Sequence, residues 1–118
     1  MKLNIEIETF DNRLDSKLFD VTRISDKTEK SITEGISVRY EWTLIRKAEG
    51  FPEIVNIALF IGEHVALPIA VSIVSKWLYD KLKERKDNKL RINNTSVEIN
   101  AERIEQLIIN ILKEKKEE

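Results

Sequence analysis

A long apolar segment between Ile54 and Leu82 constrains this chain more than any other feature of its sequence. Glu63 and His64 interrupt the segment, and its stretch from 65 to 75 contains no charged residue. A helix that is apolar around its whole circumference has to be covered on every side, by its own chain, by copies of itself, by a partner or by lipid. A chain of 118 residues has few other elements with which to cover such a helix. We therefore predict a buried central helix that also takes part in contacts beyond the single chain.

Composition and length indicate one globular domain over residues 1–118. Hydrophobic residues make up 42% of the chain and charged residues 35%, with three glycines and two prolines, which excludes a low-complexity or disordered class. Cysteine is absent, so a disulfide framework and a thiolate metal site are excluded. Residues 1–8 alternate between apolar and polar, which predicts a strand rather than a signal peptide. We therefore expect a cytoplasmic protein.

Alternating residues predict strands in three further places. Residues 36–46 form the clearest strand, and residues 89–99 predict a hairpin that turns at Asn93 and Asn94, since asparagine tolerates a positive φ. The charged run 26–31 predicts a solvated loop, and residues 10–34 fit a short helix slightly better than a strand. The alternation in the clearest strand places five residues on one face: Ile36, Val38, Tyr40, Trp42 and Leu44.

Two helices complete the expected fold. The longer helix should run from about 52 to 86, with a kink or break at Pro68 because proline lacks a backbone donor. The second should begin after Asn100, a good N-cap, and carry a narrow apolar stripe to about 115. The expected class is therefore α+β: a small, mostly antiparallel sheet packed by a long kinked central helix and a C-terminal amphipathic helix.

The residues that could carry chemistry do not form a catalytic pattern. Glu63 and His64 are adjacent, and neighbouring residues on a helix point about 100° apart. Ser72 and Ser75 are not in the glycine-flanked turn that exposes a nucleophilic serine, and the isolated glycines exclude a phosphate-binding loop. We expect a protein that is not an enzyme and that has no cofactor and no metal.

A basic cluster follows the apolar segment. Between 76 and 91 the chain carries seven basic and three acidic residues, a local charge of +4, whereas the whole chain has a net charge of −1. This balance disfavours a nucleic-acid partner, because a binder needs an excess of positive charge. The basic residues are Lys76, Lys81, Lys83, Arg85, Lys86, Lys89 and Arg91.

Membrane contact is an alternative interpretation of the same region. Residues 54–75 number 22, the length that a bilayer needs, and the basic cluster would lie at the cytoplasmic headgroups. Three polar residues inside this window weigh against insertion. They are Asn56, Glu63 and His64.

The uncharged stretch is the expected surface for self-association. Its circumference exceeds what two helices and a small sheet can cover, so we predict a homo-oligomer. The interface candidates are Val65, Leu67, Ile69, Val71, Ile73, Val74 and Trp77.

The order of elements in the second half of the chain also carries a family resemblance. A small apolar helix over 57–71, a basic ending at 76–86, a hairpin at 90–99 and a closing helix follow one another within residues 53–113. This pattern resembles the effector-associated constant component, a type of small accessory protein found beside effector enzymes in prokaryotic conflict systems. The resemblance covers about half of the chain and implies a non-catalytic accessory role with an effector protein as partner. We thus expect an oligomerising or partner-binding accessory module of a defence or stress system, with a membrane-contacting component as the alternative.

Overall fold

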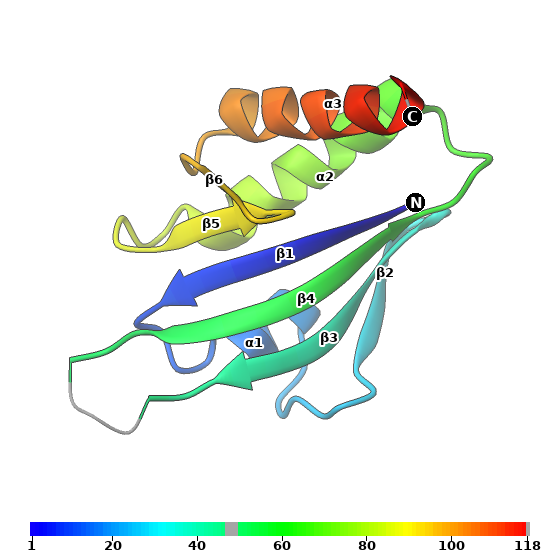
Figure 1. Ribbon diagram of the computed structural model, residues 1–118. Coiled ribbons are helices and arrows are strands. Elements are labelled where there is room, and N and C mark those ends of the chain that lie inside the picture. The colour runs from blue at the N-terminus through cyan, green and yellow to red at the C-terminus, as the bar shows by residue number, and fades with distance from the viewer. Residues whose placement is uncertain (47–49, 118) are drawn as a thin grey trace.

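The computed structural model describes residues 1–46 and 50–117 as one compact α+β domain, which confirms the predicted fold class (Figure 1). In chain order the elements are β1 (Lys2–Thr9), α1 (Leu14–Phe19), β2 (Glu29–Thr33), β3 (Ile36–Leu44), β4 (Glu53–Ile61), α2 (Leu67–Leu82), β5 (Lys89–Ile92), β6 (Thr95–Val97) and α3 (Ala101–Glu117).

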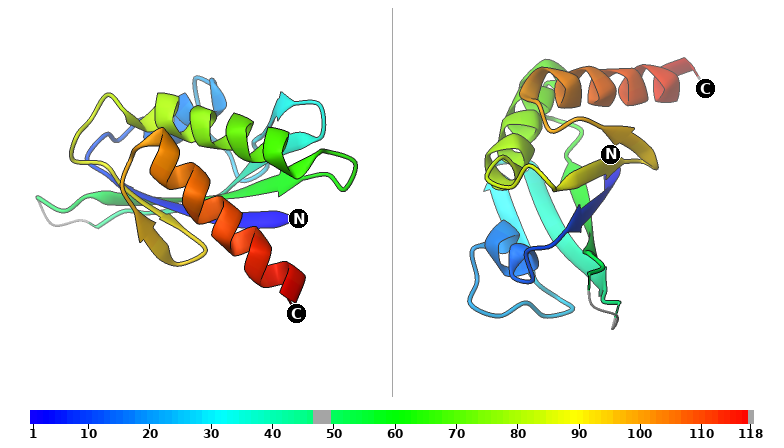
Figure 2. Two further views of the ribbon diagram at one scale, coloured as in Figure 1. Left: turned by 90° about the horizontal axis from the view of Figure 1, so that it is seen from above. Right: turned by 90° about the vertical axis from the view of Figure 1, so that its left-hand side faces the viewer.

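The described strands form one six-stranded sheet in the order β2-β3-β4-β1-β5-β6, and every neighbouring pair is antiparallel. The sheet is curved, α2 lies against its concave face, and α3 packs beyond α2 (Figure 2). None of the described helices lies on the opposite face of the sheet, which we call the open face.

Alternation along the strands determines which side chains enter the core. In β1, Leu3, Ile5 and Ile7 are buried, whereas the residues between them lie on the open face. Helix α1 covers the same face as α2, and the ring of Phe19 meets the ring of Tyr40 edge-on with centroids 6.3 Å apart. The core is therefore a single layer between the concave face of the sheet and the helices.

The predicted long helix is wrong in its first half. Residues 53–61 form strand β4, in which Val55, Ile57 and Leu59 are fully buried on the concave face. The run looks helical because β4 is a central strand and Ala58, on the open face, is also buried, so few polar residues interrupt it. Pro68 lies in the first turn of α2, where its missing N–H costs nothing, and it does not kink a longer helix.

Two features of the first half of the chain also differ from expectation. The charged run predicted as a loop ends in the edge strand β2. The residues of β2 are exposed or half-buried, because this strand pairs with β3 on one side only. In β3 a β-bulge between Tyr40 and Trp42 shifts the register, so that Trp42 pairs with Asn56 and Leu44 pairs with Ile54. Trp42 and Leu44 consequently lie on the open face and not with Tyr40 in the core.

The hairpin and the last helix are confirmed in detail. Asn93 and Asn94 have φ angles of 47° and 67°, as a tight hairpin turn requires. The Oδ1 atom of Asn100 accepts hydrogen bonds from the backbone N–H groups of Glu102 at 2.9 Å and Arg103 at 3.1 Å, which caps α3.

Alanine at Gly35 should destabilise the fold more than alanine at Gly50. Both glycines have a positive φ, 82° and 89°. A Cβ at Gly35 would lie 2.4 Å from Cγ2 of Val65, whereas a Cβ at Gly50 would have no neighbour within 4 Å. We expect a loss of about 3 kcal/mol for Gly35→Ala and about 1 kcal/mol for Gly50→Ala, since only the first adds a clash to the strained backbone. Urea unfolding of the two variants would measure the difference, and equal losses would contradict the packing described here.

Candidate interaction surface

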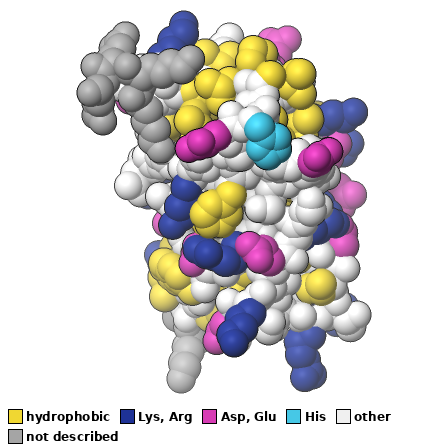
Figure 3. Space-filling model, turned by 90° about the vertical axis from the view of Figure 1, so that its right-hand side faces the viewer, with side chains coloured by type: hydrophobic (Ala, Val, Ile, Leu, Met, Phe, Trp, Pro, Cys, Tyr) yellow, Lys and Arg dark blue, Asp and Glu magenta, His cyan; other side chains and the backbone are white. Residues whose placement is uncertain are grey.

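An apolar surface lies where the first turns of α2 meet the C-terminal half of α3. Figure 3 shows hydrophobic side chains gathered above His64 on this side of the molecule. A groove of about 320 Å³ runs between the two helices. Its apolar lining is formed by Leu67, Pro68, Val71, Ile109 and Leu112. We call this feature the helix-end groove.

The sequence of α3 explains why this surface is left uncovered. Ile104, Ile108 and Leu112 form the stripe that packs into the core, and Ile109 widens the stripe by one further apolar position. Helix α2 covers the stripe only in part, so Ile109 stays half-buried at the groove. On the other side of the groove the exposed Pro68 connects it to Ile69, whose side chain is 60% exposed. The apolar surface therefore extends from the groove onto the outer side of α2.

The polar lining of the groove carries one charge of each sign. Glu105 is half-buried and Lys113 is exposed, and both belong to α3. Neither forms an ion pair with a side chain of residues 1–46 or 50–114. The groove is thus apolar along its floor, and its rim carries an acid and a base eight positions apart.

The predicted interface residues have three different environments. Val71 and Val74 are buried in the core, with 1% and 0% exposure; Val71 lines the groove, whereas Val74 offers no exposed surface to a partner. Ile69 is exposed. The remaining candidates are half-buried against the core: Val65, Leu67, Ile73 and Trp77.

Sequence reasoning missed the contribution of α3 to this surface. Pro68, Ile109 and Leu112 line the groove but were not among the candidates. The doublets Ile108–Ile109 and Ile111–Leu112 are the available signal, because they broaden the apolar stripe beyond the width that one neighbouring helix covers.

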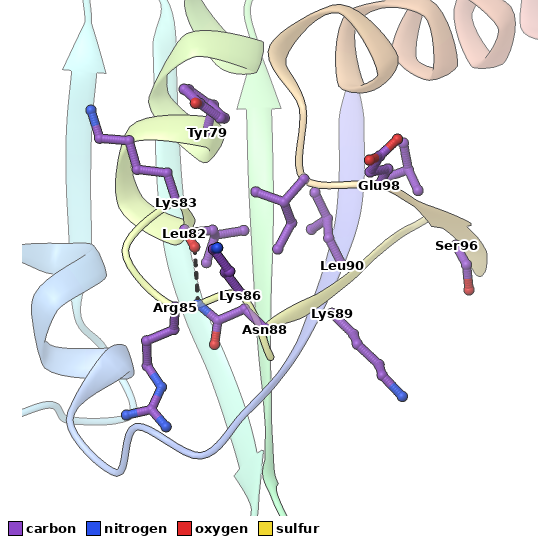
Figure 4. A pocket seen from close by; sticks show the side chains of 12 residues that line it. Tyr79, Leu82, Lys83, Arg85, Lys86, Asn88, Lys89, Leu90, Ser96 and Glu98 are labelled. Atoms are coloured by element: carbon purple, nitrogen blue, oxygen red, sulfur yellow. Dashed lines mark hydrogen bonds between the residues drawn. The ribbon is translucent and has the colours of Figure 1, made fainter.

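The basic residues are dispersed and do not form one patch. A second hollow, of about 530 Å³, lies between the end of α2 and the β5–β6 hairpin and is lined by Lys83, Arg85, Lys86 and Lys89 (Figure 4). In this view Lys83, Arg85 and Lys89 point away from one another, so their charges do not converge on one ligand. The Arg85 guanidinium instead makes two 3.2 Å contacts to Asp87.

The other basic residues lie outside this hollow. Lys81 donates to Asp20 at 2.9 Å, and burial lowers the pKa of this lysine. Arg91 lies 3.4 Å from Glu6 on the open face, and Lys76 is exposed on α2. The basic residues of the sequence cluster are therefore divided between this hollow, the open face and the side of α2, and the expectation that nucleic acid is not a partner stays a prediction.

The Glu63–His64 pair lies in the loop between β4 and α2, and not within a helix as predicted. Both residues are exposed, and the His64 ring lies over Gly35 and Gly62. The described residues contain no group of three or more histidine, cysteine or acidic side chains able to hold a metal. Ser75 is buried and its hydroxyl donates to the carbonyl of Val71 at 2.7 Å, the structural role typical of a serine within a helix.

The membrane interpretation relied on a continuous helix over 54–75, and this helix does not exist, because 53–61 is a strand. Within the part of the chain that the structure describes, no helix combines the length and the apolar character needed to cross a bilayer.

Comparison with known proteins gives no relative: no protein-family model matches the chain, and no significant match was found among curated proteins or solved structures.

Proposed function

We propose that this protein is a non-catalytic oligomerising module, in which the helix-end groove of one copy packs against the same surface of a second copy. The observation that carries the proposal is the combination of an apolar floor, an adjacent exposed isoleucine and two rim charges of opposite sign. Exposed apolar surface of this kind, bordered by polar residues, is typical of sites of protein association.

The rim charges favour a second copy over an unrelated partner. A twofold dimer uses the same patch on both subunits, so the patch has to be complementary to itself. When two α3 helices lie antiparallel across such an axis, Glu105 of each copy approaches Lys113 of the other. The axis would pass near Ile109, midway between the two charges in sequence, and Ile69 of each copy would be covered. One surface thus supplies its own hydrophobic contacts and its own ion pairs.

Exchange of the rim charges tests this arrangement. Glu105→Lys alone and Lys113→Glu alone should each raise the dissociation constant of the dimer about tenfold, because the axis produces two like-charge contacts. The double variant should restore association, since the charges have only changed places. Sedimentation velocity over a dilution series measures the three constants.

The matched control is Glu84→Lys, which makes the same charge change at an exposed position after α2. It should leave the dissociation constant unchanged. Failure of the double variant to recover would exclude the antiparallel pairing of α3 helices.

An accessory role beside an effector protein is the biological setting that we propose for such a module. It rests on the resemblance of residues 53–113 to the effector-associated constant component. Co-purification with the product of a neighbouring gene that encodes an effector enzyme would test it, and a gene neighbourhood without any such enzyme would count against it.

A further inference from the structure

Large apolar side chains are exposed around the end of β3 and the start of β4. The β-bulge turns Trp42 and Leu44 onto the open face, where Leu44 pairs with the half-buried Ile54. Ile45 follows β3, and Phe51 precedes β4. The exposed fractions of these side chains lie between 42% for Leu44 and 65% for Ile45. Exposed apolar residues that gather in one place are typical of an interaction site. We call this group the strand-end patch: Trp42, Leu44, Ile45 and Phe51.

The strand-end patch lies at one extremity of an elongated molecule. The domain measures 43 × 26 × 26 Å, and the end of β3 and the start of β4 project from it, as Figure 1 and Figure 2 show. The helix-end groove lies past the other end of β4, where α2 begins, and the nine residues of β4 span about 30 Å. A projecting end can meet a flat surface without a clash from the rest of the domain.

Basic side chains at this end of the molecule lie outside the acidic ones. Glu8 of β1 and Lys89 of β5 belong to the same cross-strand row as Leu44. They form an ion pair in which the lysine side chain is 77% exposed and the glutamate side chain 34%. Two further pairs have the same order of exposure: Lys17 with Asp11, and Arg39 with Glu41.

The remaining charges close to the patch follow the same rule. Glu53, the first residue of β4, is half-buried, and burial raises the pKa of its carboxyl, as do the neighbouring carboxylates of Asp15 and Asp11. Arg46 is exposed, and its guanidinium lies over the ring of Phe51, 5.6 Å from the centroid. The charge that this end presents outward is therefore positive, which is complementary to the phosphate groups of lipids.

These features together suit the surface of a phospholipid bilayer. Indole and phenyl rings concentrate at the boundary between headgroups and acyl chains, and basic side chains beside them reach the phosphates. A protein partner would have to be concave to cover a projecting end, whereas a fluid bilayer adapts to its shape.

We propose that the strand-end patch binds the surface of a phospholipid bilayer, with its four apolar side chains between the headgroups and Arg46 at the phosphates. The protein then lies on the bilayer and does not cross it. Four partly exposed side chains bind more weakly than one acyl chain, so half of the protein should be bound at about 1 mM accessible lipid. The proposal does not rest on the dimer, because the patch and the helix-end groove share no residue.

Quenching of Trp42 fluorescence by lipids with brominated acyl chains is the direct test. The chain has two tryptophans, so Trp77→Phe leaves Trp42 as the only indole. Vesicles of equal parts phosphatidylcholine and phosphatidylglycerol should shift its emission to shorter wavelength, and the brominated form of these lipids should quench it. The reciprocal variant, Trp42→Phe, leaves only the half-buried Trp77 and should show neither effect.

Ile45→Glu tests whether the patch is the part that inserts. A carboxylate at this position would lose its water on insertion, so the lipid concentration for half binding should rise at least about tenfold in sedimentation with vesicles. The matched control is Thr95→Glu, which adds the same charge at an exposed position on the edge strand β6. It should bind vesicles like the wild type.

Three results would overturn the proposal. Trp42 emission that no vesicle shifts or quenches would leave the strand-end patch to a protein partner. Equal quenching of Trp42 and Trp77 would show that the vesicles bind an unfolded chain. A change of Trp42 emission on simple dilution without lipid would assign the patch to contact between copies.

Discussion

Val74→Asp should leave the chain largely unfolded at room temperature. The Val74 side chain on α2 has no exposed surface and belongs to the hydrophobic core, so a carboxylate there would lose its water and gain no partner. A buried, unpaired charge costs about 4 kcal/mol or more. This is most of the stability of an ordinary domain, which is about 5–15 kcal/mol. Far-ultraviolet circular dichroism and a thermal melt would record the loss of structure.

Ser72→Asp provides the matched control for this change. It adds the same charge two positions earlier on α2, at an exposed residue, and should alter the melting temperature little. The comparison also separates the two roles considered for Val74. A core residue unfolds the protein when it is charged, whereas an interface residue would give a folded monomer. A folded, monomeric Val74→Asp variant would therefore contradict the burial described here.

The local elements that sequence could predict are those with a strong local signal. The alternation of Leu3, Ile5 and Ile7 predicts β1, the tolerance of Asn93 for positive φ predicts the hairpin, and the capping side chain of Asn100 predicts the start of α3. Each signal lies within a few residues and depends little on the rest of the fold.

The elements that could not be predicted depend on neighbours distant in sequence. Strand β4 is covered on both faces along part of its length, so its apolar run is as compatible with a buried helix as with a strand. The bulge before Trp42 exists only in the pairing of β3 with β4, and a single strand sequence does not contain it. Both errors arise because periodicity measures burial and not backbone conformation.

In the candidate site, too, the residues that depend on distant neighbours were harder to predict than those with a local signal. The sequence predicted Ile69 as a surface contact, because it lies in an uncharged stretch that one small domain cannot cover, and the structure leaves this residue exposed. It also predicted Val74, which is fully buried in the core. Ile109 was not predicted, because its exposure depends on where α3 crosses α2.

Ile69→Glu should dissociate the proposed dimer without unfolding the chain. Ile69 is 60% exposed in the single chain, so glutamate there keeps its water in the monomer and loses it only in the dimer. A twofold dimer buries this carboxylate in both subunits, so the cost of removing its water arises twice. We therefore expect the dissociation constant to rise at least about 100-fold. The control is Ile45→Glu, an exposed isoleucine just past the end of β3, away from both helices, with 65% exposure. It should dimerise like the wild type.

Multi-angle light scattering can test whether the helix-end groove joins two copies of the chain. The wild type, Ile69→Glu and Ile45→Glu are measured at the same concentration, in the micromolar range. We expect twice the 13.8 kDa mass of one chain for the wild type and for Ile45→Glu, and the mass of a single chain for Ile69→Glu. A wild type with the mass of one chain, or an Ile69→Glu variant with the mass of two, would contradict it.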